Sequence, residues 1–276
     1  MRLTNLRVLS LENPLGIDTK PYFSWMLESK VPNTMQHSYR LTVTDECGML
    51  CWDTGVLLSD RNTFLPYSGE ALKSRTRYNW TVTVTDNHGS EASASAYFET
   101  ALLEHQDWVA QWARSPYRKK KGKPGFGNQS PATMFRQGFV LRDTPVRVRM
   151  YATCHGIYEL YINGARPDQR RFAPEHTSYG QYLCYQTYDI TDLCTKGENA
   201  VGLYVGDGWY ISPQSLPNIK HMDYAHAVLF QIDVTYADGS CQQICSGAQT
   251  KAAYGPVHFS DLYVGQFTKT RCICRS

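Results

Sequence analysis

The sequence has no long apolar run. No window approaches about 18 uninterrupted apolar residues, so no segment matches the length of a membrane-spanning helix. Residues 1–7 also lack the apolar stretch of a secretory signal. Neither sign of charge predominates, because 28 Lys and Arg residues nearly balance 25 Asp and Glu residues and leave a net charge of +3. Proteins that bind nucleic acids usually carry a larger excess of positive charge. We therefore expect a cytoplasmic protein with neither a membrane nor a nucleic-acid partner.

Motifs of several enzyme classes are also missing. There is no Gly-x-Ser-x-Gly elbow, no phosphate-binding Walker loop and no dinucleotide fingerprint. The nine cysteines cannot all pair, and none of their spacings is the C-x2-C knuckle of a structural zinc site. We expect reduced thiols in a reducing compartment rather than zinc. His221 and His226, with Asp223 between them, form a weak metal motif, because a spacing of five residues does not suit one helix face.

Strand-forming residues are abundant. The 276 residues are 13% aromatic and only 19% charged, and Tyr alone occurs 19 times. This composition fits half-buried pleated sheets, and a chain of this length can bury roughly 70% of its unfolded surface. A basic stretch with Gly and Pro, residues 117–128, is best interpreted as a solvated surface loop, with an anion-binding patch as the alternative. We predict an all-β protein.

Residues 1–102 predict a small sandwich of the immunoglobulin or fibronectin type III kind. In residues 77–85, Tyr78, Trp80, Val82 and Val84 alternate with polar residues, as in a strand with one buried face. Asp86 to Gly89 then turns the chain. Further strands are expected at residues 22–27, 38–44 and 95–100. About seven strands in about 100 residues is typical of this fold class.

Residues 103–276 predict a second, larger β-sandwich of jelly-roll type. Its first residues form a connector in which Trp108 and Trp112 would pin an entering strand. Asn163-Gly164 is the signal of a tight hairpin, and residues 237–240 form another turn. The expected strands are residues 135–141, 146–152, 156–162, 200–205 and 227–236. No amphipathic helix longer than about two turns is evident, which favours the all-β architecture.

Several stretches, in a constant order, resemble the N-terminal modules of bacterial α-L-rhamnosidases. In the first module they are residues 11–18 (LENPLGID), 23–25 (FSW), 52–55 (WDTG), 72–80 (LKSRTRYNW) and 98–100 (FET). In the second they are residues 107–112 (DWVAQW), 135–136 (FR), 156–164 (GIYELYING), 187–191 (TYDIT), 197–200 (GENA) and 206–210 (GDGWY). The resemblance extends from about residue 5 to about residue 266. It implies a fibronectin type III-like module followed by a carbohydrate-binding-type β-sandwich.

The resemblance also implies an inverting glycosidase whose catalytic carboxylates lie in a later (α/α) barrel, outside this sequence. We therefore assign no catalytic residue. After Gln266 the family continues with an aromatic and acidic residues, whereas residues 267–276 are basic and contain two cysteines. We interpret this tail as the product of a frameshift. Sequencing of the gene beyond Gln266 tests this hypothesis.

Carbohydrate-binding residues are expected around residues 206–210. Two glycines would turn the chain sharply and present Asp207, Trp209 and Tyr210 at a sandwich edge, where aromatic faces stack on sugars. Packing of Trp209 and Tyr210 against protein is the favoured alternative. Near the hairpin, Glu159 and Asn163 are weaker candidates, and Asn163 fits a turn role better. The polar stretches 166–172 and 175–179 could line a cleft, and calcium is an open alternative.

Three functions remain open at this point. The first is the non-catalytic N-terminal part of an α-L-rhamnosidase, which serves as a scaffold with a carbohydrate contact. The second is an autonomous module that binds rhamnose or another glycan through Asp207 and Trp209. The third, an active hydrolase, would need carboxylates outside the family barrel. We also expect self-association through surface that later domains normally cover.

Overall fold

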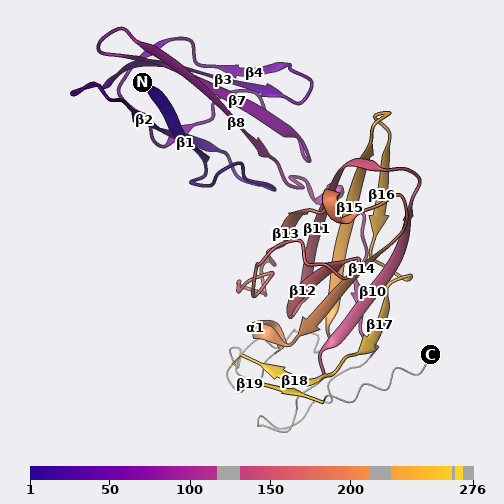
Figure 1. Cartoon of the computed structure of the whole chain (residues 1–276). Coiled ribbons are helices and arrows are strands. Elements are labelled where there is room, and N and C mark those ends of the chain that lie inside the picture. Colours follow the sequence, from indigo (N-terminus) through magenta and orange to yellow (C-terminus); the bar gives the residue numbers. More distant parts are fainter. Residues whose placement is uncertain (117–130, 212–224, 263–264, 270–276) are drawn as a thin grey trace. The chain divides into compact units, whose positions relative to one another are not determined.

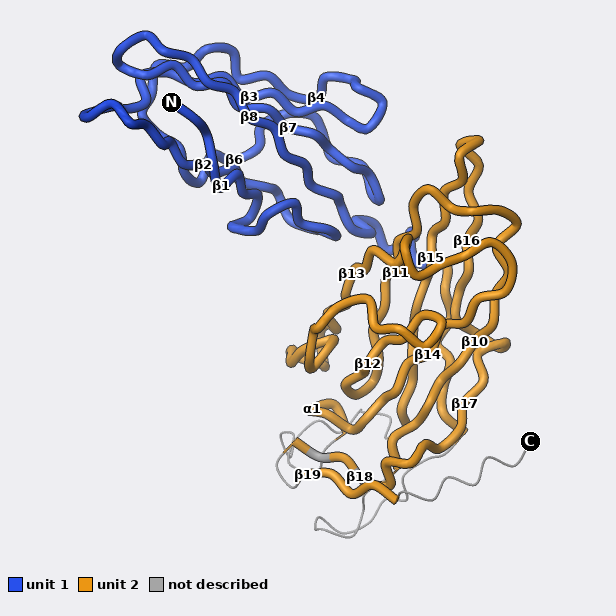
Figure 2. The backbone as a smooth tube through the Cα atoms, viewed as in Figure 1, with its two compact units in different colours: residues 1–108 blue, residues 109–276 orange. Residues whose placement is uncertain are grey.

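The computed structural model describes residues 1–116, 131–211, 225–262 and 265–269. The chain forms two compact units, Met1–Trp108 and Val109–Ser276 (Figure 2). This boundary lies six residues after the expected one, because the segment after residue 102 bonds back to the first unit. Ser74 Oγ accepts a hydrogen bond from the Leu103 N–H at 3.0 Å, and Arg75 Nη2 donates to the Asp107 carbonyl oxygen at 2.9 Å.

The first unit is a β-sandwich of two antiparallel sheets (Figure 1). One sheet has the order β1-β2-β6; the other has the order β4-β3-β7-β8, with β5 also paired to β3. The elements are β1 (Arg2–Val8), β2 (Tyr22–Glu28), β3 (Gln36–Asp45), β4 (Leu50–Asp53), β5 (Leu57–Leu58), β6 (Leu65–Pro66), β7 (Arg77–Asp86), β8 (Glu91–Glu99) and the 3-10 turn η1 (His105–Asp107). The predicted immunoglobulin-like sandwich is confirmed.

The alternation predicted for residues 77–85 forms the core of this unit. Trp80 and Val82 on β7 are fully buried, whereas Asn79, which precedes Trp80, is exposed. Phe23 of β2 packs on Trp80, with ring centroids 4.9 Å apart. Asp86 closes the following turn, since its backbone N–H donates to the Ser90 carbonyl oxygen at 2.9 Å. The sandwich therefore follows from period-two patterns that are readable in the sequence.

The second unit is a larger antiparallel sandwich (Figure 1). Its sheets have the orders β12-β14-β10-β17 and β13-β11-β15-β16, with β9 paired to β15; β18 and β19 form a separate hairpin. The elements are β9 (Ala113–Arg114), β10 (Thr133–Leu141), β11 (Pro145–His155), β12 (Ile157–Ile162), β13 (Gln186–Asp189), η2 (Thr191–Leu193), β14 (Gly197–Gly206), α1 (Gly208–Ile211), β15 (Ala227–Tyr236), β16 (Cys241–Cys245), β17 (Lys251–Tyr254), β18 (Val257–Asp261) and β19 (Gly265–Thr268). In the described part, no helix has the length and apolar character needed to cross a bilayer.

Strand β14 lies at the centre of one sheet and determines which residues reach the outer surface. Its neighbours are β10 and β12, and both pairings run without a break in register. Val201, Leu203 and Val205 point inward and are buried in the core between the sheets. Ala200, Gly202, Tyr204 and Gly206 alternate with them on the outer face.

The predicted Asn163-Gly164 hairpin is confirmed. Asn163 has φ 50° and Gly164 has φ 85°, which are the left-handed values of a two-residue type I′ turn. Ile162 and Ala165 close the turn through reciprocal backbone hydrogen bonds of 2.8 and 2.9 Å.

The tail that we expected to be atypical is partly paired. Phe267 and Thr268 lie in β19, where they pair with β18. Residues 270–276 lie outside the described residues, as does the basic stretch 117–128.

Candidate functional site

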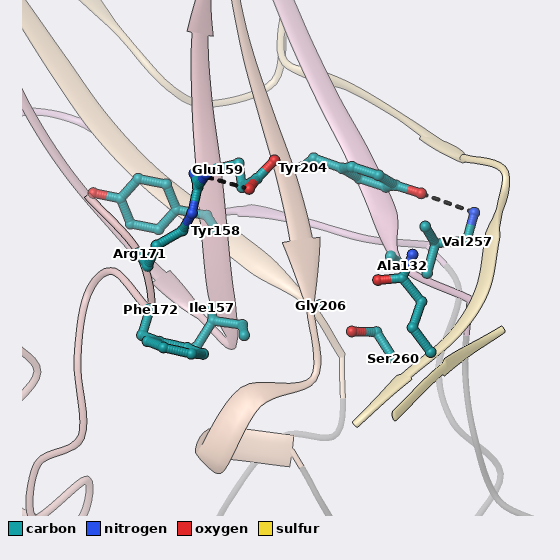
Figure 3. A pocket seen from close by; sticks show the side chains of 11 residues that line it. Ala132, Ile157, Tyr158, Glu159, Arg171, Phe172, Tyr204, Gly206, Val257 and Ser260 are labelled. Carbon is teal, nitrogen blue, oxygen red and sulfur yellow. Dashed lines mark hydrogen bonds and ion pairs between the residues drawn. The ribbon is translucent and has the colours of Figure 1, made fainter. Parts of the chain in front are cut away.

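A cleft of about 270 Å³ opens beside the end of β14 (Figure 3). Ile157 and Phe172 lie on one side, and Val257 and Ser260 lie across from them. Gly206 forms part of the floor. The lining residues are Ala132, Ile157, Tyr158, Glu159, Arg171, Phe172, Tyr204, Gly206, Val257, Ser260 and Gln266. Charged, hydroxyl and aromatic side chains thus meet in one concave surface, as in small-ligand sites.

Glu159 is the carboxylate in this cleft, and it is held by a network of donors. Arg166 Nη1 donates to Oε1 at 2.9 Å, and the Tyr161 hydroxyl donates to Oε2 at 2.8 Å. Arg171 Nη1 lies 3.6 Å from Oε1, at the rim of the cleft. The hydrogen bond to Glu159 raises the pKa of Tyr161, because it stabilises the protonated hydroxyl. The carboxylate is therefore oriented by three side chains.

Phe172 presents an aromatic ring at the mouth of the cleft. It is 53% exposed, and its φ of 59° is rare for a bulky residue. Backbone bonds on its C-terminal side hold the segment, since Ala173 O accepts from Tyr158 N at 2.8 Å and Phe172 O accepts from Glu175 N at 2.7 Å. Sparsely populated backbone conformations of this kind cluster at functional sites.

Asp207 does not lie at an exposed edge, so the expectation of an accessible sugar ligand there is wrong. It is only 1% exposed, and its Oδ1 is 3.0 Å from His226 Nε2. His226 Nδ1 lies 2.9 Å from Thr133 Oγ1, in an environment that is also buried. This arrangement links the end of β14 to the starts of β10 and β15. The role of Asp207 in the described structure is to brace these strands.

Tyr210 and Trp209 pack against other rings, as the alternative interpretation held. Tyr210 is 8% exposed and stacks on His155, with centroids 4.3 Å apart. Trp209 is half-buried, and its ring centroid lies 5.8 Å from those of Phe172 and His176. Trp209 thus supports the ring of Phe172 from outside the cleft lining. Tyr210 is too enclosed to offer a face to a sugar.

His155 is a buried histidine that sequence reasoning missed. The ring centroid of Trp112, in the connector, lies 4.2 Å from that of His155. Among the described residues, His155 Nδ1 has no hydrogen-bond partner. Burial, assisted by the positive charge of Arg114, lowers its pKa to about 4. The imidazole is therefore neutral at ordinary pH and acts as an aromatic packing element.

Asn163 has a structural role. Its Nδ2 donates to Leu193 O and to Asn199 Oδ1, both at 2.8 Å, and its Oδ1 accepts from the Ala200 N–H at 2.8 Å. The side chain is engaged on both ends, which confirms the turn role that we favoured.

The described ranges contain no cluster of metal-binding side chains. There, no three His, Cys, Asp or Glu side chains gather closely enough to hold a metal ion. His221 and Asp223 of the histidine motif lie outside the described residues, whereas His226 bonds to Asp207. The seven described cysteines are free thiols, at positions 47, 51, 154, 184, 194, 241 and 245.

The chain consists of two successive β-sandwich modules, and the second has an open cleft. Each module matches a known domain. Residues 3–104 match the model described as Rha78A-like, N-terminal immunoglobulin domain. Residues 143–272 match the model of the alpha-L-rhamnosidase N-terminal domain, a match that includes the first residues of the tail. The chain thus corresponds to the N-terminal modules of α-L-rhamnosidases.

Relatives support this assignment over nearly the whole chain. An alpha-L-rhamnosidase of Formosa agariphila is 31% identical over 92% of the chain, and one of Alteromonas sp. is 29% identical over the same share. The solved alpha-L-rhamnosidase of Dictyoglumus thermophilum superposes with a TM-score of 0.85, at 31% identity over 98% of the chain. The chain spans 29% of the length of each of those two curated relatives and 31% of that solved structure.

Proposed function

We propose that this chain is the non-catalytic N-terminal part of a glycoside hydrolase that releases terminal α-L-rhamnose. The observation that supports the proposal is the match of both units to N-terminal domains of proteins named alpha-L-rhamnosidase. In this role the two sandwiches are a scaffold, and each is stabilised by its own buried core.

The chemistry of the cleft agrees with a non-catalytic role. Glycosidases use two carboxyl groups, roughly 5–9.5 Å apart, on either side of the scissile bond. Among the described lining residues Glu159 is the sole carboxylate, and Arg166 and Tyr161 already bind both of its oxygens. The described lining residues therefore offer no acid and base pair.

The experiment is an assay of the purified chain with 4-nitrophenyl α-L-rhamnopyranoside. We expect no release of nitrophenol above the rate without protein, while a full-length alpha-L-rhamnosidase serves as the positive control. Turnover by the chain that Glu159→Gln abolishes would overturn the proposal, because it would locate catalysis in this cleft.

We also propose a second function, contact with carbohydrate in the cleft. The exposed ring of Phe172 suits the apolar face of a pyranose, and Arg171 and Glu159 suit its hydroxyls. This site replaces the one expected around Asp207, which is buried.

Calorimetric titration with L-rhamnose tests the contact. We expect saturable heat from the unchanged chain and none from Phe172→Ala. Val146→Ala is the matched control, because Val146 is 57% exposed on β11 and does not line the cleft. Equal binding by Phe172→Ala and the unchanged chain would contradict the assignment of this cleft.

A further inference from the structure

Two glycines on the outer face of the second unit have no structural reason to be glycine. Gly202 is near the middle of β14, and Gly138 is near the end of β10. Neither has a positive φ. A Cβ on Gly202 would meet no atom closer than 3.7 Å, and one on Gly138 none closer than 3.8 Å. Both distances are ordinary van der Waals contacts.

The strand pairing gives no reason for these glycines either. β10 and β14 pair without a bulge from Thr133 opposite Val205 to Leu141 opposite Gly197. Glycine inside a strand weakens it, and it usually marks a bulge, a bend or the close approach of a ligand or another backbone. With an unbroken register and an ordinary φ, the explanation that remains is close approach of a ligand or of another backbone.

Both glycines lie in the floor of hollows along β14. Gly202 lies in a hollow of about 400 Å³, with Tyr161, Tyr204 and Met134 among its lining residues. Gly138 lies in a second hollow, of about 460 Å³, which Val140 and Glu198 also line.

The two hollows and the cleft adjoin one another through shared lining residues. The two hollows share Arg136 and Ala200 with each other, and the first shares Tyr204 with the cleft. Together they follow β14 from Gly206 to Glu198, and at the rise of a β-strand these eight steps span roughly 27 Å. Such a trough is several times longer than one pyranose ring. Figure 1 shows β14 between β12 and β10.

We propose that this trough binds an extended glycan, with one sugar in the cleft and the following sugars along β14. The inference rests on the proposed carbohydrate contact. Tyr161 and Tyr204 provide apolar surface for sugar rings, and the exposed side chains of Arg136 and Glu198 provide a donor and an acceptor for hydroxyls. The adjacent cleft and the polar rim favour a glycan over a strand of another protein.

The experiment is a calorimetric titration with L-rhamnose and with linear α-linked L-rhamnose di-, tetra- and hexasaccharides. For the unchanged chain, we expect the affinity to rise at least about tenfold from monosaccharide to hexasaccharide. Gly202→Leu fills the central hollow, so this rise should disappear while binding of the monosaccharide is unchanged. Gly202→Ala adds one methyl group and should give an intermediate result. Thermal unfolding of both variants establishes that they are folded.

The results separate this inference from the proposed function. An affinity that does not rise with chain length, or a rise that Gly202→Leu leaves intact, overturns the trough but not the cleft. If Gly202→Leu abolishes the rise while Phe172→Ala binds all the sugars normally, the trough stands and the cleft assignment fails. If no sugar of any length binds, both are wrong.

Discussion

Gly202→Ala should stabilise the second unit. Glycine in a strand interior destabilises a protein by roughly 0.5–1 kcal/mol relative to alanine, because more backbone freedom is lost on folding. The new Cβ would lie 3.7 Å from Phe135 O and 4.0 Å from Tyr161 Cβ, so no strain offsets the gain. We expect the free energy of unfolding to rise by about 0.5–1 kcal/mol. For a unit of this size the melting temperature should rise by about 1–4 °C.

Gly156→Ala is the matched comparison, since it adds the same methyl group at the residue that joins the end of β11 to the start of β12. Gly156 has φ 138°, and its Cβ would lie 2.2 Å from Gly206 O. Overpacking costs about 1–3 kcal/mol and a disfavoured backbone conformation a similar amount, so this variant should lose about 2–6 kcal/mol.

Differential scanning calorimetry measures both variants, with the transition of the second unit compared to that of the unchanged chain. The first unit provides an internal reference, because its transition should not move. Destabilisation by Gly202→Ala would refute the reasoning, since it would show that the glycine is needed for folding. That result would also remove the basis for the glycan trough.

Two further variants test other parts of the second unit. The pKa of His155 is lowered to about 4 from an ordinary value near 6.5. Because the unfolded chain therefore binds this proton more tightly than the folded chain, the free energy of unfolding falls as the pH drops from about 6.5 to 4. The loss approaches about 3 kcal/mol, and His155→Phe should remove this part of the pH dependence in urea titrations at several pH values. An unchanged pH dependence in His155→Phe would contradict the assignment. Asn163→Ala should cost about 3 kcal/mol, because it loses three hydrogen bonds and places alanine at φ 50°. Asn163→Gly keeps the turn and should cost less in the same assay; equal losses would mean that the backbone conformation is unimportant.

Local patterns predicted most of the fold. The alternation in residues 77–85 and the Asn163-Gly164 pair depend on neighbours within a few positions, and the structure has them where expected. The site could not be predicted to the same extent. Asp207 was expected to be exposed, but it is buried and pairs with His226, which is 19 residues away in the chain and directly precedes β15. Phe172 belongs to a polar loop whose conformation depends on the pairing of Ala173 with Tyr158.

The sequence by itself determined the two β-sandwiches, their turns and the family, because period-two burial, turn residues and ordered motifs are local properties. Outside the strands with clear alternation, the tertiary structure alone decided which side chains face solvent. Glu159, Arg171 and Phe172 meet in one cleft only because β12 and the following loop fold beside β14. The open floor at Gly202 also emerges only in three dimensions, since a glycine without strain or crowding is recognised by what surrounds it.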